Sequence, residues 1–178
     1  KRPLRVRVVA DHDDDTVAFT DYHGIYINAC NHITWSLPTR LLRSMSLEGF
    51  NAHECGHNLF TDNRIWNSYF SKLEKGKFYP KMPDGLDSMQ KLHARDILEA
   101  VLDETDTVPY QVIMSVAHAL QNILEDGYVD ARYSYEFPGS PAKGIALNNL
   151  RFADTVPEIS EMINRKYYDH SIVLNLQI

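Results

Sequence analysis

The feature that most restricts this chain is the pentapeptide HECGH at residues 53–57, which has the form HExxH. Side chains four residues apart share one face of an α-helix, so His53 and His57 can bind one metal ion if this segment is helical. Two imidazole nitrogens suit zinc and leave room for a third protein ligand and a water molecule. Glu54 then stands where it can take a proton from that water. The alternative is a pair of surface histidines on a polar helix.

A third metal ligand has to come from elsewhere in the chain. A histidine six residues after His57 would complete a different zinc pattern, but that position holds an asparagine. Asp62 lies near the expected end of the helix, and we expect it to hold a ligand imidazole in place. On a later helical stretch, Glu125 shares one face with His118 and Asn122, at spacings of three and four residues.

Glu125 is our prediction for the third ligand, because a buried polar line on a helix is costly unless metal binding satisfies it. Spacing leaves the alternative equally open: a solvated acidic helix end, capped by Gly127. Asp126 and Asp130 are four residues apart and are expected to orient the ligand histidines, and Asn122 is expected to support them.

Hydrolysis by such a site also needs a hydrogen-bond donor for the oxyanion. His118 is one candidate, and Tyr133 and Tyr135 in a polar, aromatic segment are others. A second row of polar residues recurs at helical spacing, and we interpret it as the solvent-exposed face of an amphipathic helix rather than as a ligand row. This row consists of His93, Asp96, Glu99 and Asp103.

Composition limits the class of protein. The chain has 178 residues, of which 44% are hydrophobic and 24% charged, as expected for a single domain covering 1–178. A net charge of −6 without a basic run argues against nucleic acid or an anionic membrane as a partner. No apolar stretch approaches the roughly 20 residues that span a bilayer. Two cysteines are too few for a disulfide scaffold, so a cytoplasmic location is expected. We also expect a fragment of a longer protein.

The order of local patterns predicts an α+β fold, with a small N-terminal sheet followed by a mainly helical region. The helical region begins at Pro38, carries the HExxH and the Glu-bearing helices, and has a break near Gly49. A loop is predicted over 133–144. Strands are predicted over 4–10, 16–20 and 25–29, with a hairpin turn at 21–24. Later helices are predicted over 65–73, 86–104, 109–125 and 157–169.

Three segments resemble bacterial and phage metallopeptidase-like proteins that often carry a von Willebrand factor A domain downstream. They are TDYHGIYIN at 20–28, HECGHNLFTD at 53–62 and NILED at 122–126. HExxH with a distant helical glutamate is similar to the gluzincin branch of zinc peptidases. The resemblance covers about the first 130 residues.

This resemblance implies a zincin-like fold with Glu125 as the third zinc ligand. It also implies that a sheet edge at 25–29 lies beside the metal-binding helix and can receive an extended peptide. Gluzincins of the thermolysin type place an aspartate four residues after the ligand glutamate. That position is Val129 here, so Asp126 is expected to take its role.

The resulting hypothesis is zinc-dependent hydrolysis of a peptide bond in a peptide or protein substrate, with Glu54 as general base. One alternative is a non-catalytic metal-binding scaffold that acts with an ATPase or another protein partner, such as a downstream von Willebrand factor A domain. The other is a helical interaction module without metal. A water molecule as the fourth zinc ligand would favour hydrolysis over the scaffold.

Overall fold

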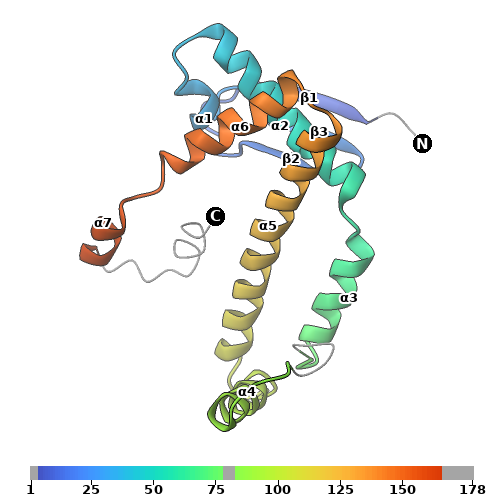
Figure 1. The fold of residues 1–178 in the computed structure, drawn as a ribbon, viewed down its shortest axis with the longest axis vertical. Helices are drawn as coiled ribbons and strands as arrows, with labels where there is room; N and C mark the ends of the chain where they lie inside the picture. The colour runs from blue at the N-terminus through green and yellow to red at the C-terminus, as the bar shows by residue number, and fades with distance from the viewer. Residues whose placement is uncertain (1–3, 78–82, 166–178) are drawn as a thin grey trace. The chain divides into compact units, whose positions relative to one another are not determined.

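The structure is a computed structural model that describes residues 4–77 and 83–165 (Figure 1). Within these residues the predicted α+β class is confirmed: a three-stranded sheet comes first, and the chain after it is mostly helical. The chain divides into two compact units. The first runs up to Thr61 and resumes at Ile123, and the second spans residues 62–122. Each unit is described by itself below.

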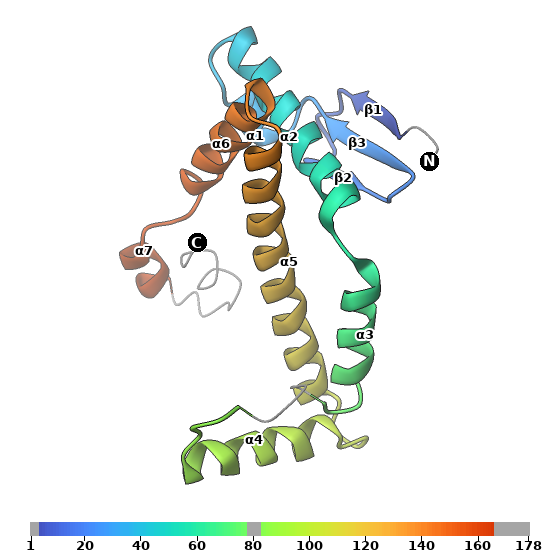
Figure 2. The ribbon, with the colours of Figure 1, turned by 45° about the vertical axis from the view of Figure 1, so that its right-hand side comes forward.

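The sheet has the strand order β1-β3-β2 (Figure 2). Strand β3 (Gly24–Asn28) lies in the middle, parallel to β1 (Arg5–Val9) and antiparallel to β2 (Ala18–Thr20). The predicted hairpin between the second and third strands is therefore confirmed. The prediction that residues 25–29 form a sheet edge is wrong, because β3 is hydrogen-bonded on both sides. The strand beside the metal-binding helix that does lie at an edge is β2.

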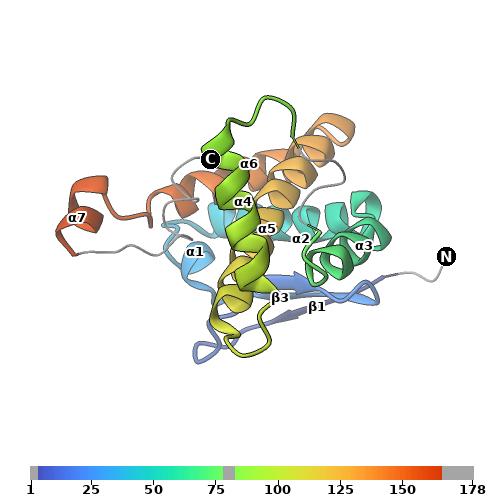
Figure 3. The ribbon, with the colours of Figure 1, turned by 90° about the horizontal axis from the view of Figure 1, so that it is seen from below.

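Alternation along β3 produces the core of the first unit. Ile25 and Ile27 are 2% and 1% exposed, and they cluster with Ile33 and Phe50. Successive side chains of a strand point to opposite faces, so both isoleucines reach the same side of the sheet. Helix α2 (Arg40–Phe60) contacts β2 and β3, as Figure 3 shows from another direction. The sheet thus supports the helix that carries HExxH.

Helix α2 is one continuous helix of 21 residues, so the predicted break near Gly49 is wrong. Thr39 caps its start, since the Thr39 side chain accepts a hydrogen bond from the Leu42 backbone N–H. A short helix that the sequence analysis did not predict, α1 (His32–Trp35), precedes it and is capped by Asn31.

Helix α6 (Ser140–Ala153) packs across α2 at a pair of glycines. A Cβ atom on Gly49 would overlap the Gly144 backbone, and a Cβ on Gly144 would overlap the Met45 carbonyl oxygen. The two backbones meet because neither glycine has a side chain, and this close approach explains why α2 tolerates Gly49. At this pair of glycines no side chain separates the two helices, so α6 lies directly on the α2 backbone.

The predicted loop over 133–144 is wrong for most of its length. Helix α5 (Val108–Glu136) runs through its first part, and α6 begins at Ser140. The chain turns at Gly139, whose φ of 139° favours glycine. Pro141 lies in the first turn of α6, where a proline has no hydrogen bond to lose. The proline and glycine therefore mark one sharp helix-to-helix turn.

The remaining helices agree with the predicted order. In the second unit, the four residues of the polar row are all exposed, as interpreted from the sequence; the first three lie on α4 (Ser88–Val101), and Asp103 follows it. The last predicted helix is shorter than expected, and residues 166–169 of that prediction lie outside the described part of the chain. None of the helices in the described ranges combines the length and hydrophobicity needed to cross a membrane. The elements are α3 (Asn63–Leu73), α4 (Ser88–Val101) and α7 (Ile159–Asn164).

We predict that Gly49→Ala lowers the free energy of unfolding by about 1–3 kcal/mol, because the added methyl group overpacks the α2–α6 crossing. Gly127→Ala is the matched control, since a Cβ there meets nothing within 4 Å. The control should raise stability by about 0.5–1 kcal/mol through helix propensity. Urea unfolding followed by circular dichroism measures both, and equal stability of the two variants would contradict the close crossing.

Candidate metal centre

The candidate centre forms where α2 meets the part of α5 that belongs to the first unit. Val129 is 0% exposed, and its Cγ1 atom lies only 2.4 Å from the place that a Cβ on Gly56 would occupy. The missing side chain of Gly56 therefore lets α5 approach α2 closely. Asp126 and Asp130 lie three residues before and one residue after Val129, so this contact carries both carboxylates to the histidines.

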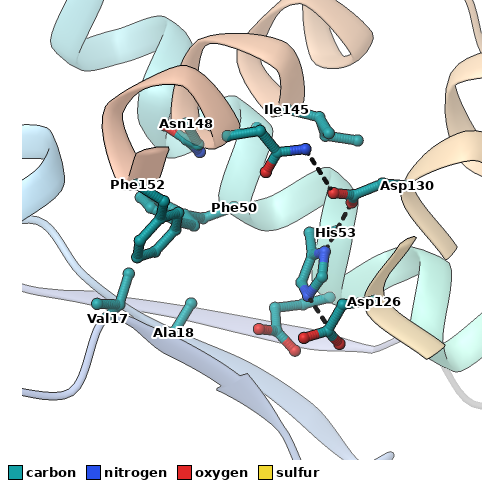
Figure 4. A pocket seen from close by; sticks show the side chains of 12 residues that line it. Val17, Ala18, Phe50, His53, Asp126, Asp130, Ile145, Asn148 and Phe152 are labelled. Atoms are coloured by element: carbon teal, nitrogen blue, oxygen red, sulfur yellow. Dashed lines mark hydrogen bonds and ion pairs between the residues drawn. The ribbon is translucent and has the colours of Figure 1, made fainter. Parts of the chain in front are cut away.

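Three donor atoms converge at this point. The Nε2 atoms of His53 and His57 lie 3.2 Å apart. Asp126 Oδ1 lies 3.2 Å from His57 Nε2 and 3.8 Å from His53 Nε2. The group formed by His53, His57 and Asp126 could hold a metal ion. Figure 4 shows Asp126 at one nitrogen of the His53 ring and Asp130 at the other.

The spacing of the three atoms fits a tetrahedral ion. With zinc–ligand bonds of about 2.0–2.1 Å, two ligand atoms of a tetrahedron stand about 3.3 Å apart. The two shorter separations match this value closely, and the third is 3.8 Å. Three ligands of this kind leave a fourth position for water, as in catalytic zinc sites. Imidazole and carboxylate groups also suit other divalent ions, so the donor set does not identify the metal.

The far nitrogen of His53 is held by a carboxylate. His53 Nδ1 donates to Asp130 Oδ1 at 2.7 Å, because an ionised carboxylate can only accept. Asn149 on α6 donates its Nδ2 to the other oxygen of Asp130 at 2.9 Å. These bonds place the Nδ1 proton of His53 and direct its Nε2 lone pair toward Asp126, which is how ligand imidazoles are commonly fixed.

The pKa of His53 is raised in this setting. Burial acts in the opposite direction and lowers the pKa, but the hydrogen bond and charge of Asp130 outweigh it, with help from Asp126 and Glu54. The surroundings of the imidazole therefore favour a positive charge on or near the ring. A bound cation satisfies the same electrostatic demand as a proton does.

His57 is held through a hydroxyl group. Thr61 Oγ1 donates to Glu125 Oε1 at 2.5 Å, so the oxygen of this hydroxyl accepts from His57 Nδ1 at 3.2 Å. Thr61 follows the last residue of α2, and its backbone N–H bonds to the His57 carbonyl oxygen. A buried carboxylate, Glu125, thus fixes the orientation of the second imidazole from the side opposite to Asp126.

Glu54 is 6% exposed and stands beside the donor group without belonging to it. Burial raises the pKa of Glu54, although the nearby His53 and His57 act in the opposite direction. The backbone N–H of Thr20 also bonds to the Glu54 carboxylate. Asn58 ties the same strand to α2, since its Nδ2 donates to Thr20 Oγ1 at 2.7 Å and to the Glu54 carbonyl at 2.9 Å.

The structure therefore brings together His53, Glu54 and His57 as the sequence predicts, but with Asp126 in the position predicted for Glu125. Neighbouring residues of a helix point about 100° apart, so the register of the α5 crossing decides which carboxylate faces the histidines. Glu125 instead bonds to Thr61 behind His57. Asp126 thus stands with the two imidazoles where Glu125 was expected, and Glu125 lies behind His57.

Asp62, Asn122 and His118 lie in the second unit. Asp62 differs from its predicted role of holding an imidazole. It caps α3 and bonds to the Arg64 side chain, and these bonds lower the pKa of Asp62. Asn122 is exposed on α5. His118 is also exposed, and its ring stacks on Phe70 with the ring centres 3.9 Å apart.

The two tyrosines predicted as oxyanion donors lie on α5, one partly buried and the other exposed. Tyr135 is 84% exposed. Tyr133 packs against Phe137 and lies beside Gly56, on a partly buried face of α5. Burial raises the pKa of the Tyr133 hydroxyl. Cys55 is partly buried against the core, as a small apolar helix residue would be.

Two parts of the candidate site were not predicted from the sequence: Thr61 and one face of α6. Thr61 had no signal beyond its position just after the helix that carries HExxH. The residues of α6 did have a signal, because its polar and apolar members recur at helical spacing of three, four and seven. These residues are Ile145, Asn148, Asn149 and Phe152, which line a cavity beside His53.

Comparison with protein-family models, with curated proteins and with solved structures finds no match for this chain.

We predict that Asp126→Asn lowers zinc affinity by more than the roughly 10- to 100-fold that loss of an outer hydrogen-bond partner costs. Glu125→Gln should stay within that smaller range, because Glu125 acts through Thr61. Competition titration with a chromogenic zinc chelator measures both affinities. The reverse order of losses would show that Glu125 is the ligand after all.

A second prediction concerns the contact that sets the crossing. Gly56→Ala should weaken zinc binding and lower stability by about 1–3 kcal/mol, because the new methyl group pushes against Val129. Val129→Ala in the same chain makes room and should restore much of the zinc affinity. Zinc titration and urea unfolding of both single variants and the double variant test this coupling. Strictly additive losses would contradict it.

Proposed function

We propose that this chain is a zinc-dependent peptidase of zincin-like type, with His53, His57 and Asp126 as metal ligands. The observation that carries the proposal is the convergence of three donor atoms, at separations that suit a tetrahedral ion, beside the buried carboxylate Glu54. When both imidazoles are neutral and each donates its Nδ1–H to a hydrogen-bond partner, the two Nε2 atoms carry lone pairs and face each other at 3.2 Å. Such an arrangement is stable with a cation between them.

Zinc, when bound, supplies a Lewis acid that lowers the pKa of a bound water and polarises the scissile carbonyl. Glu54 accepts the water proton and then donates it to the leaving amine. Its raised pKa suits both steps, because it makes the carboxylate a stronger base in the first and lets more of the carboxyl group keep the proton near neutral pH until the second. The Thr20 N–H holds the Glu54 carboxylate in position while Asp130 and Thr61 keep the imidazoles oriented.

A peptide as the substrate is supported by the outer edge of β2, with which no other strand pairs in the described part of the chain. The Val17 carbonyl oxygen accepts from the Asn28 N–H, and the Asp21 N–H donates to the Gly24 carbonyl oxygen. The backbone N–H and C=O groups of Ala18 and Thr20 therefore point away from β3. Val17 and Ala18 line the same cavity as His53 and Glu54, so this stretch of the chain lies beside the candidate centre. An extended peptide that pairs with Ala18 would bring its backbone to the metal ligands by strand addition.

We predict that Glu54→Gln retains zinc but loses nearly all hydrolysis, because the amide cannot accept the water proton. A casein assay and a fluorogenic peptide library measure cleavage, and elemental analysis of tag-free protein measures zinc. Glu48→Gln is the matched control, since Glu48 is an exposed glutamate on the same helix.

Equal cleavage by wild type and Glu54→Gln would refute Glu54 as the general base. Zinc-loaded wild-type protein that cleaves none of the substrates would refute the peptidase proposal and support the metal-binding scaffold. Protein that takes up no zinc would refute both.

A further inference from the structure

A cavity of about 220 Å³ opens beside the candidate centre, entirely within the first unit. Helices α2, α5 and α6 form its walls, and the chain at the start of β2 closes the strand side. Figure 4 shows Asp126 and Asp130 at His53, and the rings of Phe50 and Phe152 next to each other on another side. The cavity therefore combines a polar end beside the metal ligands with an apolar end between the helices.

The charged side chains that line this cavity are acidic. Glu54, Asp126 and Asp130 contribute carboxylates, and the described lining residues include no lysine or arginine. His53 is neutral as a metal ligand. A divalent ion at the candidate centre sets two positive charges against these three negative ones, so the lining stays negative while Glu54 is ionised. A cleft lined by one sign of charge attracts the opposite sign, and this cavity therefore favours a cation over an anion.

The lining also has an acceptor that lacks a donor. Asn148 lines the cavity and is 3% exposed. Its Nδ2 donates to the Ser46 carbonyl oxygen at 2.9 Å, and its Oδ1 has no hydrogen-bond partner among the described residues. Asn149 Nδ2 and His53 Nδ1 both already donate to Asp130. A buried acceptor without a donor is costly, so a bound group that brings N–H donors would be stabilised here.

We propose that this cavity receives a cationic nitrogen group of the substrate together with the alkyl chain next to it. The inference rests on the proposed peptidase function and adds to it the class of substrate. The group is the ammonium or guanidinium of a basic side chain, or the α-ammonium of the first residue of a peptide. Both sources combine a positive charge and N–H donors with methylene groups. The nitrogen pairs with the carboxylates and Asn148 Oδ1, and the carbon atoms pack against Phe50 and Phe152.

The mixed lining matches a group of this kind better than a purely apolar or an acidic one. An apolar side chain of the same size would displace water from the carboxylates and leave Asn148 Oδ1 without a donor. An acidic side chain would add a further negative charge and no N–H group. A buried cation, by contrast, is tolerated where carboxylates pair with it. The size suffices, because a cavity of about 150 Å³ already holds a benzene molecule.

Binding can be measured apart from catalysis with three probes of similar size. N-acetyl-norleucine amide has no charge, N-acetyl-lysine amide is charged on its side chain, and norleucine amide is charged at its α-amine. Each is titrated into the full chain, metal-free and labelled at isoleucine and valine methyl groups, and NMR shifts of Ile145 and Val17 are followed. At least one charged probe should bind about 10-fold tighter than the uncharged probe, and its identity names the source of the cation.

Equal binding of the three probes, or no shift of these methyl groups with either charged probe, would overturn the inference. When N-acetyl-lysine amide is the preferred probe, zinc-loaded protein should keep that preference, because the lining stays negative. Its loss on zinc loading would show that the probe only replaces the metal ion, and would also overturn the inference.

Asp130→Asn tests the charge of the lining, since the amide oxygen can still accept from His53. This variant should weaken the preferred charged probe by about 5-fold or more and leave N-acetyl-norleucine amide unchanged. Glu125→Gln is the matched control, because Glu125 is a buried carboxylate near the same centre that does not line the cavity. Equal losses in the two variants would contradict the proposal.

Asn148→Leu tests the acceptor without a donor. It should weaken the preferred charged probe and spare the uncharged one, and thermal unfolding checks that the variant is folded. Equal weakening of charged and uncharged probes in the folded variant would remove Asn148 from the proposal. If the variant does not fold, the comparison of Asp130→Asn with Glu125→Gln decides the outcome.

Cleavage gives the second measurement. Zinc-loaded protein should cleave either lysine peptides in preference to norleucine peptides, or free N-termini in preference to acetylated ones, by about 10-fold in kcat/KM. The favoured pair should match the favoured probe. Cleavage without either preference would refute the role of the cavity and leave the peptidase proposal intact. Tight binding of a charged probe without cleavage of any peptide would refute the peptidase proposal instead.

Discussion

The contact between Gly56 and Val129 is the constraint on which the candidate centre depends. HExxH places two imidazoles on one face of α2, but a third ligand has to arrive on another helix. Because Gly56 has no side chain, Val129 can bury itself against α2, and this fixes both the distance and the rotation of α5. The glycine that weakens α2 as an isolated helix is the residue that lets α5 deliver its carboxylates.

Electrostatics explains why this arrangement calls for a cation. Glu54, Glu125, Asp126 and Asp130 surround two imidazoles in a partly buried space. Repulsion among carboxylates at such short range is relieved by a proton or a metal ion. The raised pKa of His53 expresses this demand in the metal-free chain. A divalent ion would meet it more fully, because the same Nε2 lone pairs could bind it and it carries a second positive charge.

The sequence predicted those parts of the site that depend on local geometry. His53, Glu54 and His57 could be placed because helical spacing relates them within one turn. The choice between Glu125 and Asp126 could not be made, since adjacent residues differ by 100° and the α2–α5 packing selects between them. One spacing in the sequence did favour Asp126. Asp130 follows Asp126 by four residues, which is the spacing of ligand and supporting aspartate in thermolysin-type gluzincins, whereas Glu125 has Val129 at that position. The loop predicted at 133–144 failed because Gly139 and Pro141 mark one sharp turn between helices.

Helix α6 links the fold to the candidate metal centre and to the cavity beside it. Gly144 sets it directly against the α2 backbone, and the next residue, Ile145, begins the face that lines the cavity. From the same face, Asn149 holds Asp130, which in turn holds His53. Packing between α2 and α6 therefore governs the cavity's width and the orientation of one metal ligand together. A substitution that shifts this crossing should change the shape of the cavity and the metal affinity at once, even though it touches no metal ligand.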